Sequence, residues 1–208
     1  LCYYPERNAL IIGQNMDGLH IIDWENKKEL GSIKLSNSQI FDIKVVKDRI
    51  IVAQGTGEVH ILDIKTLETL HVIRDSEKSA RTLAISELSG HFTVRYSPDE
   101  RFLLSGSRDA KLKIWDVIDG YTLKESVAAH MYAINHIEFS PDNKHFVTCS
   151  MDKSIKVWDA STYQLLKVID KARHAGHGTS VNKLLWSKHN NLLISASDDR
   201  SISIWDIN

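Results

Sequence analysis

A segment of 16 residues recurs three times in this chain, and the repeat constrains the fold more than any other feature. The three copies occupy residues 101–116, 144–159 and 191–206. Each copy has two apolar stretches separated by a polar tetrapeptide, and each ends in Trp-Asp. The final Asp residues of successive copies are 43 and 47 positions apart. A repeat at this period predicts neighbouring copies of one supersecondary unit.

Each copy is predicted to form two strands of a meander. The second apolar stretch alternates polar and apolar residues, as in Lys-Leu-Lys-Ile at 111–114, which is typical of a strand with one buried face. The first stretch, 102–104 in the first copy, is continuously apolar and indicates a strand covered on both faces. The tetrapeptides between them supply turn-forming residues. Ser-Pro-Asp at 97–99 and 140–142 predicts a further turn after a short upstream strand.

These motifs resemble the WD-repeat β-propeller family. Trp-Asp stands at 115–116, 158–159 and 205–206, and each Trp follows an Asp by six residues. Blades of that family have four antiparallel strands and a period of about 40 to 45 residues, which suits the spacing found here. The resemblance therefore implies an all-β fold, a β-propeller of four-stranded antiparallel blades.

Two weaker units precede the three clear ones. Ile22-Asp23 and Leu62-Asp63 stand where Trp-Asp is expected, 40 residues apart, and Trp24 lies one place too late to replace the family Trp. We therefore expect residues 1–208 to form a single propeller domain with five recognisable blades. Their approximate ranges are 1–36, 37–78, 92–128, 129–172 and 173–208.

The interval between the second and third units is irregular. Asp63 and Asp116 are 53 residues apart, and residues 79–86 read as the inner strand of a blade although a second inner strand begins at 92. Either residues 79–91 are an insertion, or they are a partial blade from which about 30 residues are absent. The second interpretation is favoured because His91, counted back from Ser-Pro-Asp, is out of register with the histidines that precede the later blades.

The ends of the chain also bear on the blade count. Propellers of this family close when the N-terminal segment supplies the outer strand of the last blade, which covers exposed edges. The chain starts on a first strand and stops on the third strand of its last blade, so this closing strand is expected to be absent. Together with the partial blade, this predicts a parent propeller of about seven blades.

The resemblance implies a hydrogen-bonded set in each well-formed blade, made of a turn Asp, a His before the blade, a Ser or Thr and the Trp. These residues are Asp152, His130, Thr148 and Trp158 in blade four, Asp199, His177, Ser195 and Trp205 in blade five, and Asp109, Ser105 and Trp115, without a His, in blade three. His, Asp and Ser also form hydrolase triads. A nucleophile is needed only once, however, so the recurrence favours a structural role, and no catalytic residue is predicted.

Composition excludes several other functions. The formal net charge is −1, so no polybasic surface for nucleic acid is expected, and no apolar stretch is long enough to span a membrane. His174 and His177 are three residues apart but lack an accompanying carboxylate or thiol, so neither a metal nor another cofactor is predicted. The first residues carry no targeting signal, which predicts a soluble, cytoplasmic protein.

A rigid scaffold with exposed loops favours a non-catalytic role in protein–protein interaction. In the family, the turns between strands two and three and the connections that lead into each blade form the usual binding platform. The candidate partner-binding residues are Arg108, Met131, Tyr132, Met151, Thr179, Ser180 and Asp198. The alternative is a propeller enzyme or small-ligand binder that uses the central channel. A lone carboxylate or histidine cluster facing the channel in one blade would favour that alternative.

Overall fold

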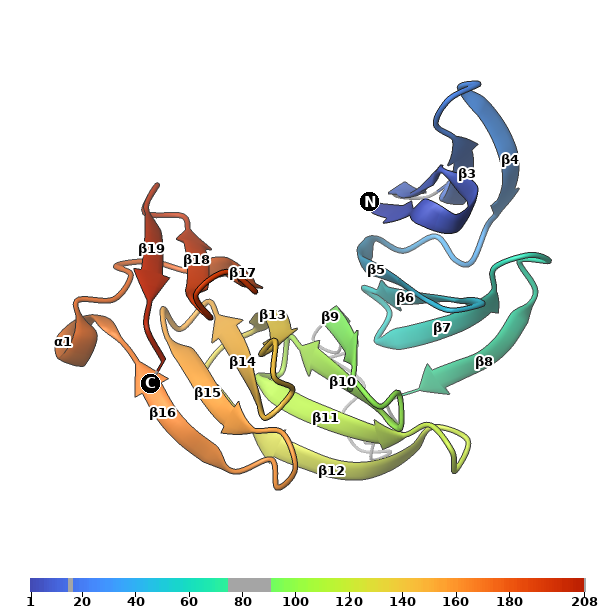
Figure 1. The fold of residues 1–208 in the computed structure, drawn as a ribbon. Helices are drawn as coiled ribbons and strands as arrows, with labels where there is room; N and C mark the ends of the chain where they lie inside the picture. Colours follow the sequence, from blue (N-terminus) through green and yellow to red (C-terminus); the bar gives the residue numbers. More distant parts are fainter. Residues whose placement is uncertain (15–16, 75–90, 208) are drawn as a thin grey trace. The chain divides into compact units, whose positions relative to one another are not determined.

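The computed structural model describes residues 1–14, 17–74 and 91–207. Apart from a 3₁₀ turn, η1 (Pro5–Arg7), and a one-turn helix, α1 (Lys171–His174), its regular elements are all strands. The strands form five antiparallel sheets, which confirms the predicted all-β class (Figure 1). The expected partial blade at 79–91 falls outside the described residues, except for His91.

Each sheet is a meander in which strands adjacent in sequence pair with one another. Sheet 1 contains β1 (Cys2–Tyr4), β2 (Ala9–Gln14), β3 (Gly18–Asp23) and β4 (Lys28–Ile33). Sheet 2 contains β5 (Ile40–Val46), β6 (Arg49–Gln54), β7 (Glu58–Asp63) and β8 (Thr69–Arg74). Sheet 3 contains β9 (His91–Tyr96), β10 (Phe102–Ser107), β11 (Lys111–Asp116) and β12 (Thr122–Ala128). Sheet 4 contains β13 (Ile134–Phe139), β14 (His145–Ser150), β15 (Ile155–Asp159) and β16 (Leu165–Ile169). Sheet 5 contains β17 (Val181–Trp186), β18 (Leu193–Ser197) and β19 (Ile202–Trp205).

The 16-residue repeats fold as the predicted hairpins. Phe102 pairs with Asp116 and His145 pairs with Asp159, so the first two copies close from the first strand residue to the final Asp, and in the third copy Leu193 pairs with Trp205. β9 begins at His91, one residue before the expected start of the third blade. His91 therefore opens an inner strand as Ile134 and Val181 do, in the register counted from Ser-Pro-Asp.

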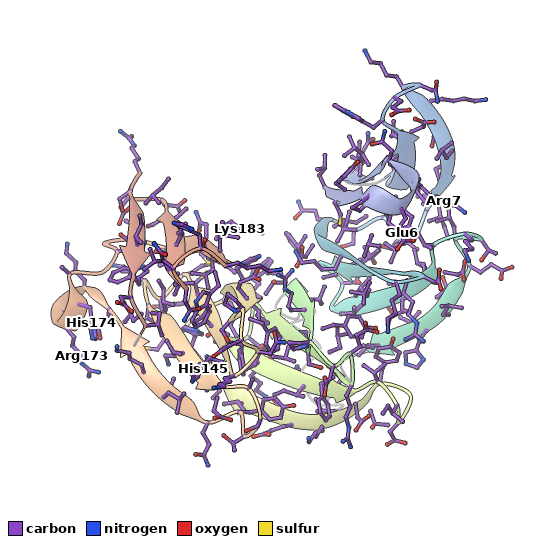
Figure 2. The ribbon with its side chains drawn as sticks, viewed as in Figure 1. Glu6, Arg7, His145, Arg173, His174 and Lys183 are labelled. Carbon is purple, nitrogen blue, oxygen red and sulfur yellow. The ribbon has the colours of Figure 1, made fainter. Side chains whose placement is uncertain are left out.

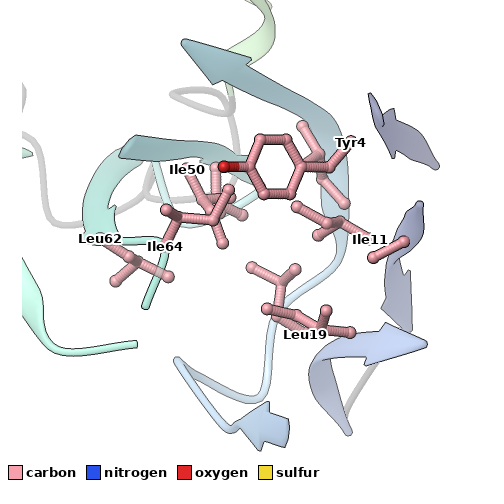
Figure 3. Packing of buried hydrophobic residues seen from close by; sticks show 10 residues of the cluster. Tyr4, Ile11, Leu19, Ile50, Leu62 and Ile64 are labelled. Carbon is pink, nitrogen blue, oxygen red and sulfur yellow. The ribbon is translucent and has the colours of Figure 1, made fainter. Parts of the chain in front are cut away.

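The chain divides into two compact units, Leu1–Val94 and Arg95–Asn208, and the division falls within β9. In the first unit, sheets 1 and 2 bury a common apolar core. Tyr4, Ile11 and Leu19 of sheet 1 face Ile50 and Leu62 of sheet 2 in this core (Figure 3). Trp24 is 59% exposed and takes no part in it, as expected from its shifted position.

In the second unit, the second strand of one sheet packs beside the inner strand of the next sheet, β10 against β13 and β14 against β17, and β13 also packs against β17. Leu112 and Ile114 of β11 are fully buried against Ile137 and Phe146 of sheet 4. The Phe146 ring stacks on Trp158 with centroids 6.0 Å apart. The alternating residues of the third strand therefore bury one sheet against its neighbour, as their period predicts.

The Asp of the Trp-Asp motif organises the turn that follows it. In sheet 4, the Asp159 carboxylate accepts hydrogen bonds from the backbone N–H groups of Ser161 and Thr162 at 2.9 and 2.8 Å. Asp23 and Asp63 make the same pair of bonds in sheets 1 and 2, which have no Trp before the Asp. These Asx-type turns explain why the Asp persists where the Trp does not.

In sheets 3 to 5, the turn between the second and third strands places a residue other than glycine in the left-handed region. Ala110, Lys153 and Arg200 have φ of 66°, 73° and 66°, and the N–H of each closes the turn onto the carbonyl three residues earlier. A Cβ in this region costs about 1–2 kcal/mol. The tight turn is thus maintained against a local backbone preference.

Replacing Lys153 with glycine is expected to stabilise the protein. Relief of the left-handed strain outweighs the larger chain entropy of glycine in the unfolded state, for a net gain of about 0.5–1 kcal/mol in urea unfolding. Lys144→Gly is the matched control, because Lys144 is also an exposed turn residue but has negative φ. Equal effects of the two substitutions would contradict this account of the turn.

Candidate functional site

A chain of hydrogen bonds runs through the interior of sheet 4. Trp158 Nε1 donates to Thr148 Oγ1 at 2.9 Å, and His130 Nε2 lies 2.8 Å from the same oxygen. On the other side of the imidazole, Nδ1 lies 2.9 Å from Asp152 Oδ2. The chain joins β15, β14, the segment before β13 and the β14–β15 turn. The structure thus brings together all four residues of the set expected in this blade.

The two ends of this hydrogen-bond chain determine the protonation state of His130. The indole N–H of Trp158 only donates, and an ionised Asp152 only accepts. Thr148 must therefore donate its hydroxyl proton to His130 Nε2, and Nδ1–H donates to Asp152. Every group is satisfied only when the imidazole is neutral. Burial, which outweighs the hydrogen bond and charge of Asp152, accordingly lowers the pKa of His130 below its usual 6.5.

Asp152 binds more than the histidine. Burial alone raises the pKa of its carboxyl, but bonds from His130, Ser154 and the backbone N–H of Met131 outweigh that effect and hold the pKa well below its usual value. Met131 N lies 3.0 Å from Oδ2, and Ser154 N and Oγ lie 3.0 and 2.6 Å from Oδ1. One buried carboxylate therefore fastens the connecting segment before β13 to the turn of the next hairpin.

The same arrangement recurs in sheet 5. Trp205 Nε1 donates to Ser195 Oγ at 2.8 Å, and His177 Nε2 lies 2.7 Å from that oxygen. His177 Nδ1 is 3.2 Å from Asp199 Oδ2, which also accepts from Gly178 N. Hydrogen bonds from Ser201 and from the Gly178 backbone lower the pKa of Asp199.

Sheet 3 differs by a residue that the sequence analysis did not single out. Trp115 Nε1 donates to Ser105 Oγ at 2.9 Å as expected. Lys113 is fully buried, and its Nζ lies 3.4 Å from Asp109 Oδ2. The Lys113 ammonium group thus contacts the turn Asp of sheet 3, whereas a histidine contacts the turn Asp in sheets 4 and 5. The alternation in Lys-Leu-Lys-Ile at 111–114 predicts that Lys113 faces solvent, and the full burial of its side chain contradicts that prediction.

The expected partner-binding residues lie on segments that these bonds hold together. Ala129 and His130 donate their backbone N–H groups to Ala110 O, in the β10–β11 turn. On the other side, Met151 N donates to Ala133 O at 3.1 Å, and Ser150 Oγ donates to Tyr132 O at 3.0 Å. The segment 129–133 is therefore fixed between two hairpin turns. We use the name hairpin rim for the turns between the second and third strands of sheets 3 to 5 together with the connecting segments that lead into sheets 4 and 5. The turns are 107–110, 150–153 and 197–200, and the connecting segments are 129–133 and 177–180.

The hairpin rim is apolar at sheet 4 and polar at sheet 5. Met131, Tyr132 and Met151 are 82%, 62% and 52% exposed, although they are large hydrophobic residues. At sheet 5 the expected polar residues bond to one another and to neighbours. Thr179 Oγ1 contacts Ser197 Oγ, Ser180 Oγ donates to Asn182, and Asn182 donates to Asp198. Arg108 is exposed at sheet 3.

The two histidines considered as metal ligands differ in solvent exposure. His174 and Arg173 lie on the exposed helix α1 (Figure 2), whereas His177 is buried in its hydrogen-bond chain. In the described part of the chain, no three His, Cys, Asp or Glu side chains are grouped so as to hold a metal ion.

Burial raises the pKa of the Cys149 thiol well above its usual value, so this thiol is unreactive. Within the described ranges, neither helix has the length and apolar character required to cross a membrane.

Comparison with known proteins finds a family whose model matches this chain. Residues 1–207 match the model of the family described as nucleolar protein 10-like, N-terminal domain. The chain is 29% identical over 126 residues to WD repeat-containing protein SL1-17 of Schistosoma mansoni, a match that covers 58% of this chain and 36% of that protein. It is 32% identical over 130 residues to nuclear distribution protein nudF of Aspergillus flavus, covering 60% of this chain and 26% of that protein. The chain thus spans about a third of the length of the first relative and about a quarter of the second.

Removing the Thr148 hydroxyl, which lies at the centre of the hydrogen-bond chain in sheet 4, is expected to destabilise the protein strongly. Thr148→Val keeps the side-chain volume but leaves Trp158 Nε1–H and His130 Nε2 buried without partners, at a cost of roughly 2–4 kcal/mol in urea unfolding. Thr69→Val, an exposed substitution on β8, is the matched control and should change stability by less than about 0.5 kcal/mol. A loss below about 1 kcal/mol for Thr148→Val would show that the hydrogen-bond chain is dispensable.

Stability is also expected to fall on mild acidification. Because the pKa of His130 is lower in the folded state, the unfolded chain binds more protons below pH 6.5. The contribution of the neutral imidazole is fully present above that pH and is lost as the pH falls toward the folded pKa. Urea unfolding from pH 7.5 to 5.0 should show the loss, and His130→Gln should be less stable at pH 7.5 with a shallower pH dependence. An unchanged slope in the variant would refute the assignment.

Proposed function

The chain belongs to the family described as nucleolar protein 10-like, N-terminal domain, and from that premise we propose that it is a non-catalytic scaffold that binds partner proteins through its hairpin rim. It is a WD-repeat β-propeller protein, and proteins with this repeat generally serve as interaction platforms. The partner's identity does not follow from the relatives' names. The proposal concerns the surface that the partner contacts.

One observation carries the proposal. Met131, Tyr132 and Met151 are exposed on segments whose backbones are fixed by hydrogen bonds to a buried carboxylate and to each other. Methionine and tyrosine are enriched at the centres of protein interfaces, and a rigid backbone lowers the entropy lost on binding. Thus the rim presents apolar side chains in a preorganised position.

A catalytic role for the His, Asp and hydroxyl groups is disfavoured by their bonding. In sheet 4, Thr148 is fully buried, accepts from Trp158 and donates to His130. A nucleophilic hydroxyl must reach a substrate, and this one is enclosed by its partners. Ser195 is in the same position in sheet 5.

Among the described residues, no observation supports the alternative of an enzyme or small-ligand binder. His136 stands on inner strand β13, where Lys183 occupies the matching position on β17. Its Nδ1 accepts a hydrogen bond from Leu184 N at 3.3 Å, so its bond joins two sheets of the second unit. The name of the family refers to the nucleolus, and we propose a nucleolar location in place of the cytoplasmic one expected from the sequence.

A triple variant tests the scaffold proposal. Met131→Ser, Tyr132→Ser and Met151→Ser together should abolish most cross-links to partner proteins in extracts of the source cells, read by quantitative mass spectrometry. The matched control replaces three comparably exposed leucines of the outer strands, Leu123, Leu165 and Leu166, with serine. Circular dichroism should show both variants folded. Equal cross-linking by wild type and the rim variant would refute the proposal.

A further inference from the structure

The charged groups of the hairpin rim differ in whether they face inward or outward. Asp152 and Asp199 have side chains that are 7% and 22% exposed, and each accepts several internal hydrogen bonds. In the same two turns, each aspartate is followed directly by an exposed cation, Lys153 or Arg200. Of the other rim carboxylates, Asp109 pairs with the buried Lys113 and Asp198 accepts a hydrogen bond from Asn182, whereas the side chains of Lys153 and Arg200 remain outside.

The two cations have no internal role. Within the described residues, the side chains of Lys153 and Arg200 make no ion pair and no hydrogen bond. They occupy the same position of equivalent turns, which holds Ala110 in sheet 3. That alanine shows that the turn itself does not require a charged residue. The cations are therefore available to a partner.

The apolar and cationic groups belong to one continuous surface. Met151 and Lys153 lie in a single turn, and Met131 is bonded through its N–H to the Asp152 carboxylate between them. Asn135 Nδ2 donates to Ser180 Oγ at 3.0 Å and to Val181 O at 2.9 Å, which joins the rim at sheet 4 to the rim at sheet 5.

Resting on the function proposed above, we infer that the partner segment bound by this rim is an acidic peptide with a large apolar side chain at its centre. The apolar side chain packs on Met131, Tyr132 and Met151, where the flexible thioethers adapt to its shape. Carboxylates on either side of it contact Lys153 and Arg200. This arrangement has an apolar centre and a polar border, as protein interfaces do.

A nucleic acid fits this surface less well than an acidic peptide. Nucleic-acid binding requires several cations along a phosphate backbone. Here the cations are few and an aspartate precedes each of them, and the chain has a net charge of −1. A peptide can instead place single carboxylates at the two cations and fill the apolar space between them.

Selection from an unbiased library of 12-residue peptides on the full chain tests the inference. We expect enrichment of peptides with Asp or Glu around one large apolar residue. Binding of an enriched peptide, measured by fluorescence anisotropy, should weaken roughly tenfold or more with Lys153→Glu plus Arg200→Glu, and should decline with added salt. Lys144→Glu, an exposed cation in the β13–β14 turn, is the matched control and should bind as wild type.

The outcomes separate this inference from the scaffold proposal. Enrichment of uncharged apolar peptides that need Met131 but neither cation would overturn the acidic partner and leave the scaffold proposal in place. Failure to enrich any peptide, or binding that neither the cation pair nor the triple serine variant weakens, would overturn both. Tighter binding of single-stranded poly-U RNA than of any peptide, lost with the two cations, would replace the acidic peptide with a nucleic acid.

Discussion

The structure depends on a line of buried hydrogen bonds that has a fixed direction. It begins at an indole N–H, which can only donate, and ends at a carboxylate, which can only accept. Between Trp158 and Asp152 the orientation of each proton is thereby determined, and no group is left without a partner. A buried polar line that is fully satisfied specifies one conformation, because a shift of any strand would expose an unpaired group in a medium of low dielectric constant.

This line connects the interior of a sheet to its surface. The carboxylate that ends it also accepts the backbone N–H of Met131, so the segment carrying the exposed apolar residues is fixed by the bonds that fix the strands. The energy that orders this segment is therefore supplied on folding, before any partner arrives. Binding through such a surface loses little further backbone entropy. The same bonds occupy the carboxylate of Asp152, whereas the side chain of the neighbouring Lys153 stays exposed.

The sequence predicted most of the fold because the repeat imposes one pattern on every sheet. The hairpins of sheets 3 to 5 form within the repeat copies at 101–116, 144–159 and 191–206, as the repeat predicts. It did not predict the left-handed conformation of Lys153, because a lysine gives no local signal for positive φ. It also did not predict the burial of Lys113, since strand alternation assigns that position to solvent. Exposure and internal bonding of the rim residues depend on neighbours distant in sequence, so the sequence could nominate Met131 and Ser180 but could not distinguish them.

That distinction shows how function is encoded in a repeated fold. Positions that repeat are needed by every sheet, and their polar groups form hydrogen bonds within the protein, as those of Asp152 and Asp199 do. Positions that differ between equivalent sheets are free of that requirement. The residue before the turn Asp is Arg108, Met151 or Asp198, and the Asp198 side chain is bonded to its own sheet through Asn182. Because a partner must recognise one arc of a repetitive surface, the specificity of binding must come from these unequal positions, and sheet 4, with its two methionines and tyrosine, departs furthest from its neighbours.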